Sequence, residues 1–238
     1  MVTNVIATTA IVIGIAVAAV TAGPAIAQVA PTASEAAAYT GLHAAAHQGD
    51  VAQIERLATT KAASNADFNA RDSNGRTPLH IASFAKQRGA IRALVKAGAN
   101  VSLLDKDRYD AVTIASVADD DETLRVLLSL GASAKLMTSR YDGTALIAAA
   151  HLGHDGVVKQ LIAAGAPLDH VNNLHWTALI ESIVLGDGGQ RHQEVLRALL
   201  AAGASTRLAD RQGNTPLALA RSRGYTAMVQ MLQQARAM

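Results

Sequence analysis

Apolar residues recur along the chain in pairs of short segments separated by a glycine turn. The run ALIAAA at 145–150 is followed by LGH at 152–154 and then by VVKQLI at 157–162, whose apolar residues fall at i, i+3 and i+4. This spacing predicts two short amphipathic helices joined by a turn. Residues 165–177 are too few for a third helix and predict an extended, hairpin-like connection.

Two sequence markers repeat along the chain. The first is a helix N-cap, whose side-chain oxygen accepts a backbone N–H at the helix start. It occurs in steps of 37, 33, 34, 33 and 38 residues at Thr40, Thr77, Asp110, Thr144, Thr177 and Thr215. The second marker, a small residue suited to the left-handed backbone at a helix end, occurs at Asn65, Gly98, Gly131, Gly165 and Gly203. Two markers of different chemistry that keep one interval predict a repeated two-helix unit.

A unit of this kind cannot bury its apolar face alone, so neighbouring units must stack. We therefore predict an all-α solenoid of about six helix-turn-helix units joined by β-hairpin-like loops. The period is interrupted by four extra residues near 59–64 and by five near 187–193. Insertions in repeat proteins usually collect as loops on one face and sometimes carry binding. We expect loops at both places.

The segment TPLHIA at 77–82 resembles the central motif of the ankyrin repeats, Thr-Pro-Leu-His-x-Ala, and the glycine turn and the closing Gly-Ala-Asp/Asn match the same family. The likeness covers 34–237, as units at about 34–71, 72–104, 105–138, 139–171, 172–209 and 210–237. It implies an ankyrin-repeat solenoid. The motif His stands only at His43 and His80, so the hydrogen bonds that the family draws from it are not expected in the later units.

Residues 1–27 carry no charge and contain a dense apolar run at 10–20. The sequence AIA at 25–27 supplies the small-x-small pattern of a cleavage site. We interpret 1–27 as a signal peptide cut after Ala27 and 28–33 as a flexible leader, which places the protein in the periplasm or outside the cell. Because no basic residue lies near Met1, an uncleaved anchor is the alternative, although the run is shorter than the about 20 residues that span a bilayer. After cleavage we expect no membrane contact.

Composition and charge narrow the function classes. Hydrophobic residues make up 50% of the 238 residues and aromatic residues only 3%, so we expect an interior of Ala, Leu, Val and Ile. Because 21 basic residues are balanced by 19 acidic ones, no broad basic field for nucleic acid is expected. The chain has no cysteine, which excludes disulfides. Arg88 and Asp121 occupy equivalent places in adjacent units, and this predicts ion pairing between neighbours.

The histidines are the first candidates for chemistry. His43 and His47 have the i, i+4 spacing of a zinc protease, but Ala44 stands where the general base would be. The glycines at 186–189 lack the spacing and the following Lys of a phosphate loop. Nothing in the sequence brings Ser, His and Asp together as a triad. We predict a non-enzymatic protein with no cofactor and no metal, and keep a metal-handling role of His43 and His47 as a weaker alternative.

Candidate binding residues follow from the family resemblance. Ankyrin repeats commonly grip partners with hairpin tips and with the last turn of each first helix, which line the concave side. Carried over position by position, this implies a partner-binding set of Arg76, Phe84, Tyr109, Arg140, Tyr141, His151, Leu174, Trp176, Leu185 and Arg211. Four of the set are aromatic, and Tyr, Trp and Arg often carry binding energy. The alternative is that these rings only pack against the sides of neighbouring hairpins. For Trp176 we favour contact with a partner.

We thus expect a monomeric interaction module that binds another protein through the concave face and hairpin tips of an ankyrin array. The alternative is a protective or structural accessory for an exported enzyme, without a defined binding groove.

Overall fold

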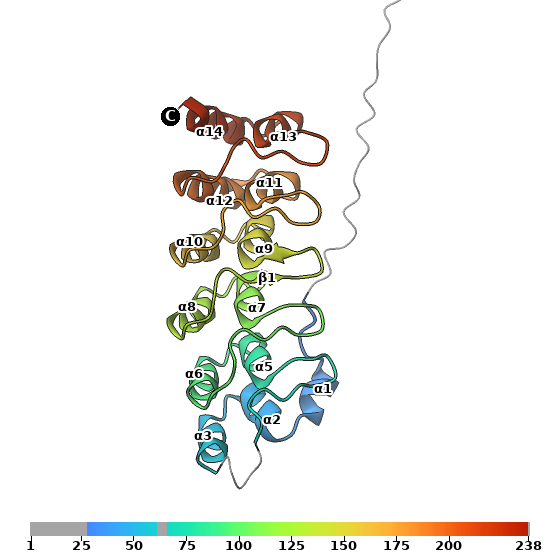
Figure 1. Cartoon of the computed structure of the whole chain (residues 1–238), viewed down its shortest axis with the longest axis vertical. Helices are drawn as coiled ribbons and strands as arrows, with labels where there is room; N and C mark the ends of the chain where they lie inside the picture. Colours follow the sequence, from blue (N-terminus) through green and yellow to red (C-terminus); the bar gives the residue numbers. More distant parts are fainter. Residues whose placement is uncertain (1–27, 61–65, 238) are drawn as a thin grey trace, which may run out of the picture.

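The computed structural model describes residues 28–60 and 66–237, which form one stack of two-helix layers (Figure 1). The first helices of the layers form one column and the second helices form another beside it. The first helices are α2 (Gly41–Gln48), α5 (Pro78–Phe84), α7 (Ala111–Val117), α9 (Ala145–Leu152), α11 (Ala178–Val184) and α13 (Pro216–Ser222). The second helices are α3 (Val51–Thr59), α6 (Arg88–Lys96), α8 (Asp121–Ser129), α10 (Asp155–Ala163), α12 (Gln190–Ala201) and α14 (Thr226–Ala237). The predicted all-α solenoid is confirmed.

Each first helix begins directly after the repeated cap residue. The side chain accepts the N–H three residues further on at Thr77, Asp110, Thr144, Thr177 and Thr215. Thr40 precedes α2 in the same way but makes no side-chain cap bond. Pro78 and Pro216 occupy the first turn of their helices, where a missing N–H leaves no helical hydrogen bond unmade.

The core is a continuous row of buried aliphatic side chains that runs through the stack. Ile54, Leu94, Leu127 and Leu161 are fully buried on the second helices. On the first helices, the residues two positions after the cap are buried at Leu79, Val112, Leu146 and Leu179. Burying one such side chain contributes about 1.5–3 kcal/mol, so each layer is stabilised by the next. Phe68 is also buried, at 2% exposure, and the expectation of a purely aliphatic interior is therefore wrong at this position.

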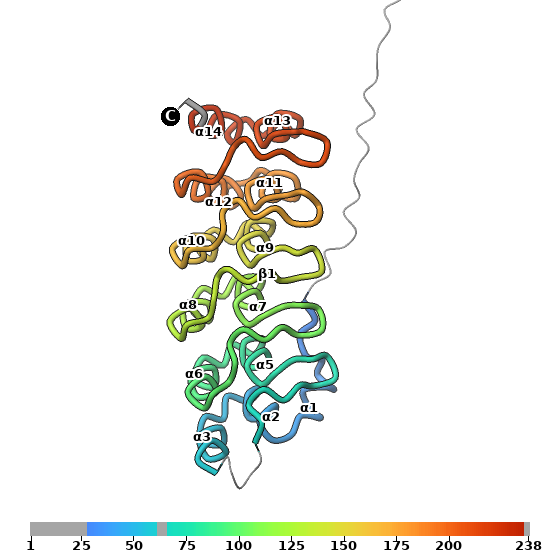
Figure 2. The backbone as a smooth tube through the Cα atoms, in the orientation of Figure 1, coloured from blue at the N-terminus to red at the C-terminus, as the bar shows by residue number. Residues whose placement is uncertain are grey.

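We call each connection from a second helix to the next first helix a finger. The fingers project from one side of the stack, beside the first helices (Figure 2). The finger before α9 contains the antiparallel pair β1 (Met137–Thr138) and β2 (Gly143–Thr144), with Met137 opposite Thr144. The residue two positions before each cap has a positive φ, at Gly75, Arg108, Asp142, His175 and Gly213. A tight turn of one conformation therefore recurs in every finger from the second to the sixth unit.

The predicted signal peptide at 1–27, its cleavage site after Ala27, residues 61–64 of the first insertion and the marker Asn65 lie outside the described residues. The segment 28–33 differs from a free leader. Thr32 caps an additional helix, α1 (Ala33–Ala38), and forms a capping box with Glu35. The carbonyl oxygen of Val29 accepts a hydrogen bond from Arg76 Nη1 at 3.1 Å, so this segment contacts the array. In the described part of the chain, no helix is both long and apolar enough to cross a bilayer.

The second insertion only partly forms a loop. Its last residues lengthen α12 to 12 residues, compared with 9 in α10, and the remainder forms a turn at 185–189. Tyr225 Oη donates to the carbonyl oxygen of Gly186 at 2.9 Å. On the other side, Arg191 Nη2 bonds Asp119 Oδ2 at 2.8 Å, two units away. The insertion therefore ties the third unit to the sixth.

Ion pairing between the second and third units is present, but its partner differs from the prediction. Arg88 pairs with Asp120 at 3.0 Å and with Glu122 at 3.1 Å. Asp121 instead accepts a hydrogen bond from Gln160 Nε2 in the fourth unit at 2.6 Å. The expected pair with Asp121 is wrong, because that side chain is directed to the other neighbour.

Candidate protein-binding surface

Each finger is shaped by one polar side chain that accepts two backbone N–H groups. The acceptor lies five residues before the cap, and its donors lie two and four residues further on. The acceptors are Asp72, Asp105, Ser139, Asn172 and Asp210. Asp and Asn are common in such turns because their side chains bond their own backbone. The acceptor stands at the same place before each cap in the sequence, but it was not predicted.

Backbone hydrogen bonds also join the fingers of the second to fifth units, each to the next. Lys106 N donates to Asn74 O at 3.0 Å, Ser139 N to Arg108 O at 2.9 Å and Asn173 N to Tyr141 O at 2.9 Å. The bonds lie within one residue of each other in the repeat register, so they align the tips in a row. The row is thereby pre-organised, which lowers the entropy lost when it contacts a partner.

Arg76 does not belong to the exposed tips. Its side chain is 1% exposed, with Nε 2.7 Å from Asp72 Oδ2 and Nη2 2.9 Å from Glu35 Oε1. Burial acts to raise the pKa of Asp72, but hydrogen bonds from Arg76 and Tyr39 outweigh it and lower this pKa. The expectation that Arg76 is an exposed contact is wrong, because α1 and the segment before it cover this finger.

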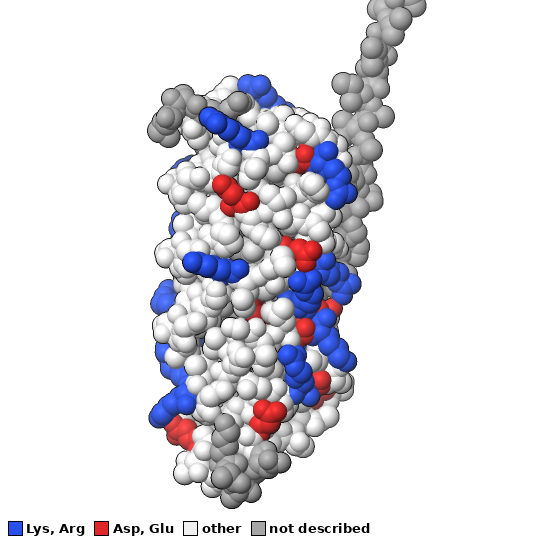
Figure 3. Space-filling view, in the orientation of Figure 1, with Lys and Arg blue, Asp and Glu red and all other residues white. Residues whose placement is uncertain are grey.

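Four of the predicted residues do come together, on the fingers of the fourth, fifth and sixth units. Tyr141 and Leu174 are each 37% exposed, and Arg140 and Arg211 flank them. Asn173 connects them: its Nδ2 donates to Arg140 O at 3.0 Å, and its carbonyl oxygen accepts from Arg211 Nη2 at 2.9 Å. Figure 3 shows basic and acidic side chains mixed along the finger side of the stack, beside a face with few charges.

The remaining aromatic and apolar members of the predicted set are less exposed than the four tip residues. Trp176, Tyr109, Phe84 and Leu185 are all half-buried. Trp176, for which the sequence favoured contact with a partner, is therefore only partly exposed. Burial raises the pKa of Tyr109, and its carbonyl oxygen accepts from His80 Nε2 at 3.0 Å.

Two exposed apolar residues on the same fingers were missed. Met137 is 47% exposed on β1, and Val171 is 42% exposed in the next finger. They precede Tyr141 and Leu174 in their fingers by four and three residues, by subtraction. The sequence carries no signal that separates them from Leu136 and Leu168, which are large apolar residues of the same two connections. We call Met137, Arg140, Tyr141, Val171, Leu174 and Arg211 the finger surface.

His151 lies at the end of α9, where a buried carboxyl group faces it. Its Nδ1 is 3.6 Å from Glu181 Oε2, and Glu181 Oε1 accepts a hydrogen bond from Asn172 Nδ2 at 2.8 Å. Burial raises the pKa of Glu181 to about 7 and lowers that of His151, which also lies near the charges of His192 and His154. His151, Glu181 and Asn172 thus link α9, α11 and a finger. Their polar side-chain atoms mostly face one another.

The motif histidine has a structural role in the second unit. His80 Nδ1 accepts from the N–H of Thr77 at 3.1 Å, and its Nε2 donates to Tyr109 O in the next finger at 3.0 Å. Burial lowers the pKa of His80 to about 4, so the ring stays neutral. In the third unit Thr113 takes this place and donates to Thr138 Oγ1 at 3.1 Å, which keeps a link between layers without His.

His43 and His47 pack beside Tyr39, with ring centroids 5.7 and 6.3 Å from it. Within 28–60 and 66–237, no three His, Asp or Glu side chains converge on a point where a metal ion could be held.

Comparison with known proteins agrees with this architecture. The family described as ankyrin repeats (3 copies) matches residues 18–105 and 112–210. The chain belongs to the ankyrin repeat family. It is similar to the ankyrin repeat protein YahD of Escherichia coli, with 36% identity over 189 residues that cover 79% of this chain and 92% of YahD.

Solved ankyrin structures superpose on the array. An ankyrin repeat domain from Acinetobacter baumannii is 42% identical with a TM-score of 0.76, covering 82% of this chain and 96% of that one. The ankyrin repeat domain of Bcl-3 is 27% identical with a TM-score of 0.73, covering 83% and 86%. Ankyrin repeat domains are generally protein–protein interaction modules and are typically non-enzymatic.

Proposed function

We propose that this ankyrin array is a monomeric module that binds another protein through the finger surface. The family resemblance implies that this surface lies on the concave side. The observation that carries the proposal is the cluster of exposed apolar side chains on two adjacent fingers, with arginines at its edge. Apolar and aromatic anchors surrounded by polar side chains are typical of the centre of a protein interface.

The residues of the finger surface are proposed to contribute differently to the affinity for a partner and to its orientation. Tyr141 and Leu174 would contribute most of the affinity, since each has apolar surface still to bury. Arg140 and Arg211 are held by their neighbours at 2.7 and 2.9 Å, so they would favour one orientation of an acidic or carbonyl-rich partner rather than add much affinity. Nothing in the described residues favours the alternative of an accessory without a defined surface.

The experiment is affinity capture from the source organism with the natural chain and two paired variants. Tyr141→Ala with Leu174→Ala should reduce partner recovery by about tenfold or more, because two apolar anchors are lost. The control, Glu55→Ala with Gln230→Ala, alters exposed side chains of second helices and should leave recovery unchanged. Both variants should keep the circular dichroism of the natural chain. Equal recovery by all three chains would contradict the proposal.

We also propose that the protein is exported and acts outside the cytoplasm. Its support is the uncharged, apolar start of the chain and the pattern at 25–27. Mass spectrometry of the protein isolated from its natural host should find a mature chain that begins at Gln28. Recovery of the chain with residues 1–27 still attached would contradict cleavage.

A further inference from the structure

The second helices carry a column of cations on the side of the stack away from the fingers. Arg92, Arg125 and Lys159 each lie 15 residues after the cap of their unit, by subtraction from Thr77, Asp110 and Thr144. Arg197 follows its cap by 20 residues, which is the same place once the five inserted residues are allowed for. All four side chains are exposed, on α6, α8, α10 and α12. We call these four residues the basic column.

The cations of the basic column are available for new partners. Within the described ranges, Arg92 and Arg125 are in no ion pair. Lys159 pairs with Asp155 at 3.0 Å and Arg197 with Glu194 at 2.5 Å, both on their own helix and with the two cations more than half exposed. Exposed pairs of this kind are weak and exchange readily for another carboxylate.

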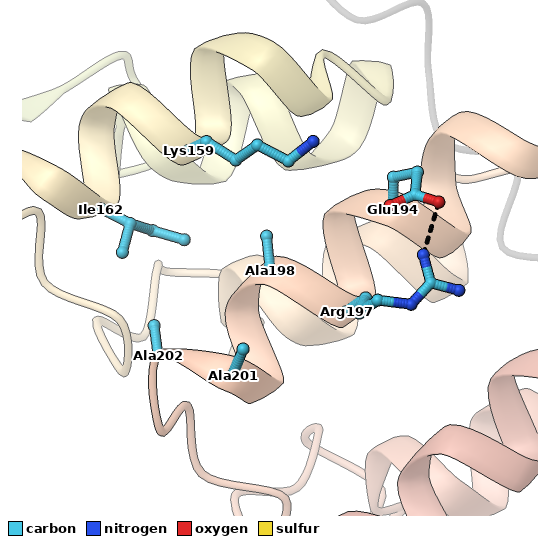
Figure 4. A pocket seen from close by; sticks show the side chains of 7 residues that line it. All are labelled: Lys159, Ile162, Glu194, Arg197, Ala198, Ala201 and Ala202. Carbon is cyan, nitrogen blue, oxygen red and sulfur yellow. Dashed lines mark ion pairs between the residues drawn. The ribbon is translucent and has the colours of Figure 1, made fainter.

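A groove lies between two members of the column. It has a volume of 410 Å³ and is bordered by Lys159 on α10 and by Glu194 and Arg197 on α12. Its floor consists of aliphatic side chains, those of Ile162, Ala198, Ala201 and Ala202. Figure 4 shows Lys159 on one side of this depression and the Glu194–Arg197 pair on the other. The groove thus places cations beside an apolar strip.

We propose that the basic column and its groove form a second docking surface, which takes an acidic segment of a protein that places aliphatic side chains between carboxylates. The carboxylates would pair with the column, and an aliphatic side chain would fill the groove above Ala198. This surface lies on the second helices and is independent of the finger surface.

The chemistry of the groove favours a protein segment over other polyanions. Asp155 and Glu194 stand among the cations and would repel a continuous phosphate backbone. The floor of the groove has no aromatic ring on which a base could stack. An anionic bilayer would require large exposed apolar side chains beside the cations, and the exposed ones in the described residues do not line this groove.

The test is titration of the full chain with a synthetic peptide of repeated Glu-Glu-Leu triplets, followed by amide NMR shifts and by calorimetry. We expect saturable shifts on α8, α10 and α12, and no saturable binding by a Glu-Glu-Ser or a Lys-Lys-Leu peptide. Lys159→Glu with Arg197→Glu should weaken binding by about tenfold. Arg207→Glu with Arg221→Glu, the same charge change at exposed sites off the column, should leave it within about twofold. Lys159→Gln with Arg197→Gln provides a milder pair if charge reversal unfolds the chain.

Several results would overturn the proposal. Shifts confined to the fingers, equal binding by both charge-reversal variants, or equal binding of the Glu-Glu-Ser peptide would each do so. Tighter binding of duplex DNA or of phosphatidylserine vesicles at the same column would overturn the choice of an acidic protein segment.

Discussion

Glu181 is the residue at which this chain departs most from the apolar pattern of its first helices. The equivalent positions of the second and third units, four residues after the cap, are the fully buried Ile81 and Ile114. Glu181 is 5% exposed and is directed between Asn172 and His151. Because burial raises its pKa to about 7, the folded protein holds a proton there that the unfolded chain releases at a lower pH.

This raised pKa predicts a pH-dependent stability. The folded state binds more protons than the unfolded state between the ordinary pKa of 4.5 and about 7, so the contribution of Glu181 is complete below pH 4.5 and lost as the pH rises through 7. Glu181→Gln keeps an oxygen for Asn172 Nδ2 but cannot ionise. The variant should match the natural chain at pH 4 and be more stable by about 3 kcal/mol at pH 8, as measured by urea unfolding. Parallel stability profiles for the two proteins would contradict this assignment.

At the residue scale, the sequence predicted what depends on local chemistry. The positions of the cap residues and of the prolines in the first turns were predictable, because these side chains themselves favour the start of a helix. The environment of Arg76 was not predictable from the repeat register, because Glu35 and Val29 come from a segment that has no counterpart in the other units. Met137 and Val171 were missed because only three-dimensional packing shows which apolar residues of a finger stay exposed.

At the scale of elements, the second insertion contacts layers other than its own. A simple surface loop would contact only the unit that carries it. Gly188 has a φ of 71°, and a Cβ placed on it would lie 2.5 Å from Tyr225 Cδ1. His192 Nε2 lies 2.9 Å from His151 O in the preceding unit. The periodicity located this insertion, but its contacts with the third and sixth units depend on the side chains that it carries.

A matched pair of glycine substitutions tests this connection. Gly188→Ala and Gly203→Ala both place a side chain at positive φ, but only the first meets another group, since nothing lies within 4 Å of a Cβ at Gly203. Gly203→Ala should cost about 1 kcal/mol of unfolding free energy through backbone strain. Gly188→Ala should cost about 1–3 kcal/mol more, because the Tyr225 ring must move. Equal losses in thermal unfolding would show that the contact with Tyr225 is unimportant.

At the scale of the whole molecule, stacking gives the array two long surfaces of different character. On one side, the fingers present exposed apolar residues in a hydrogen-bonded row. On the other side, the second helices present a line of cations. The number of units and their order followed from the period alone, since each layer contacts mainly its neighbours. Which face binds a partner does not follow from the period, because it depends on the residues that stacking leaves exposed.

The most direct test of the finger surface is hydrogen–deuterium exchange of the full chain, alone and with its captured partner. We predict that binding slows exchange in the fingers at 137–143 and 170–176, while α12 at Gln190–Ala201 is unchanged. Protection confined to the second helices, with no change in these two fingers, would contradict the finger surface as the partner-binding site.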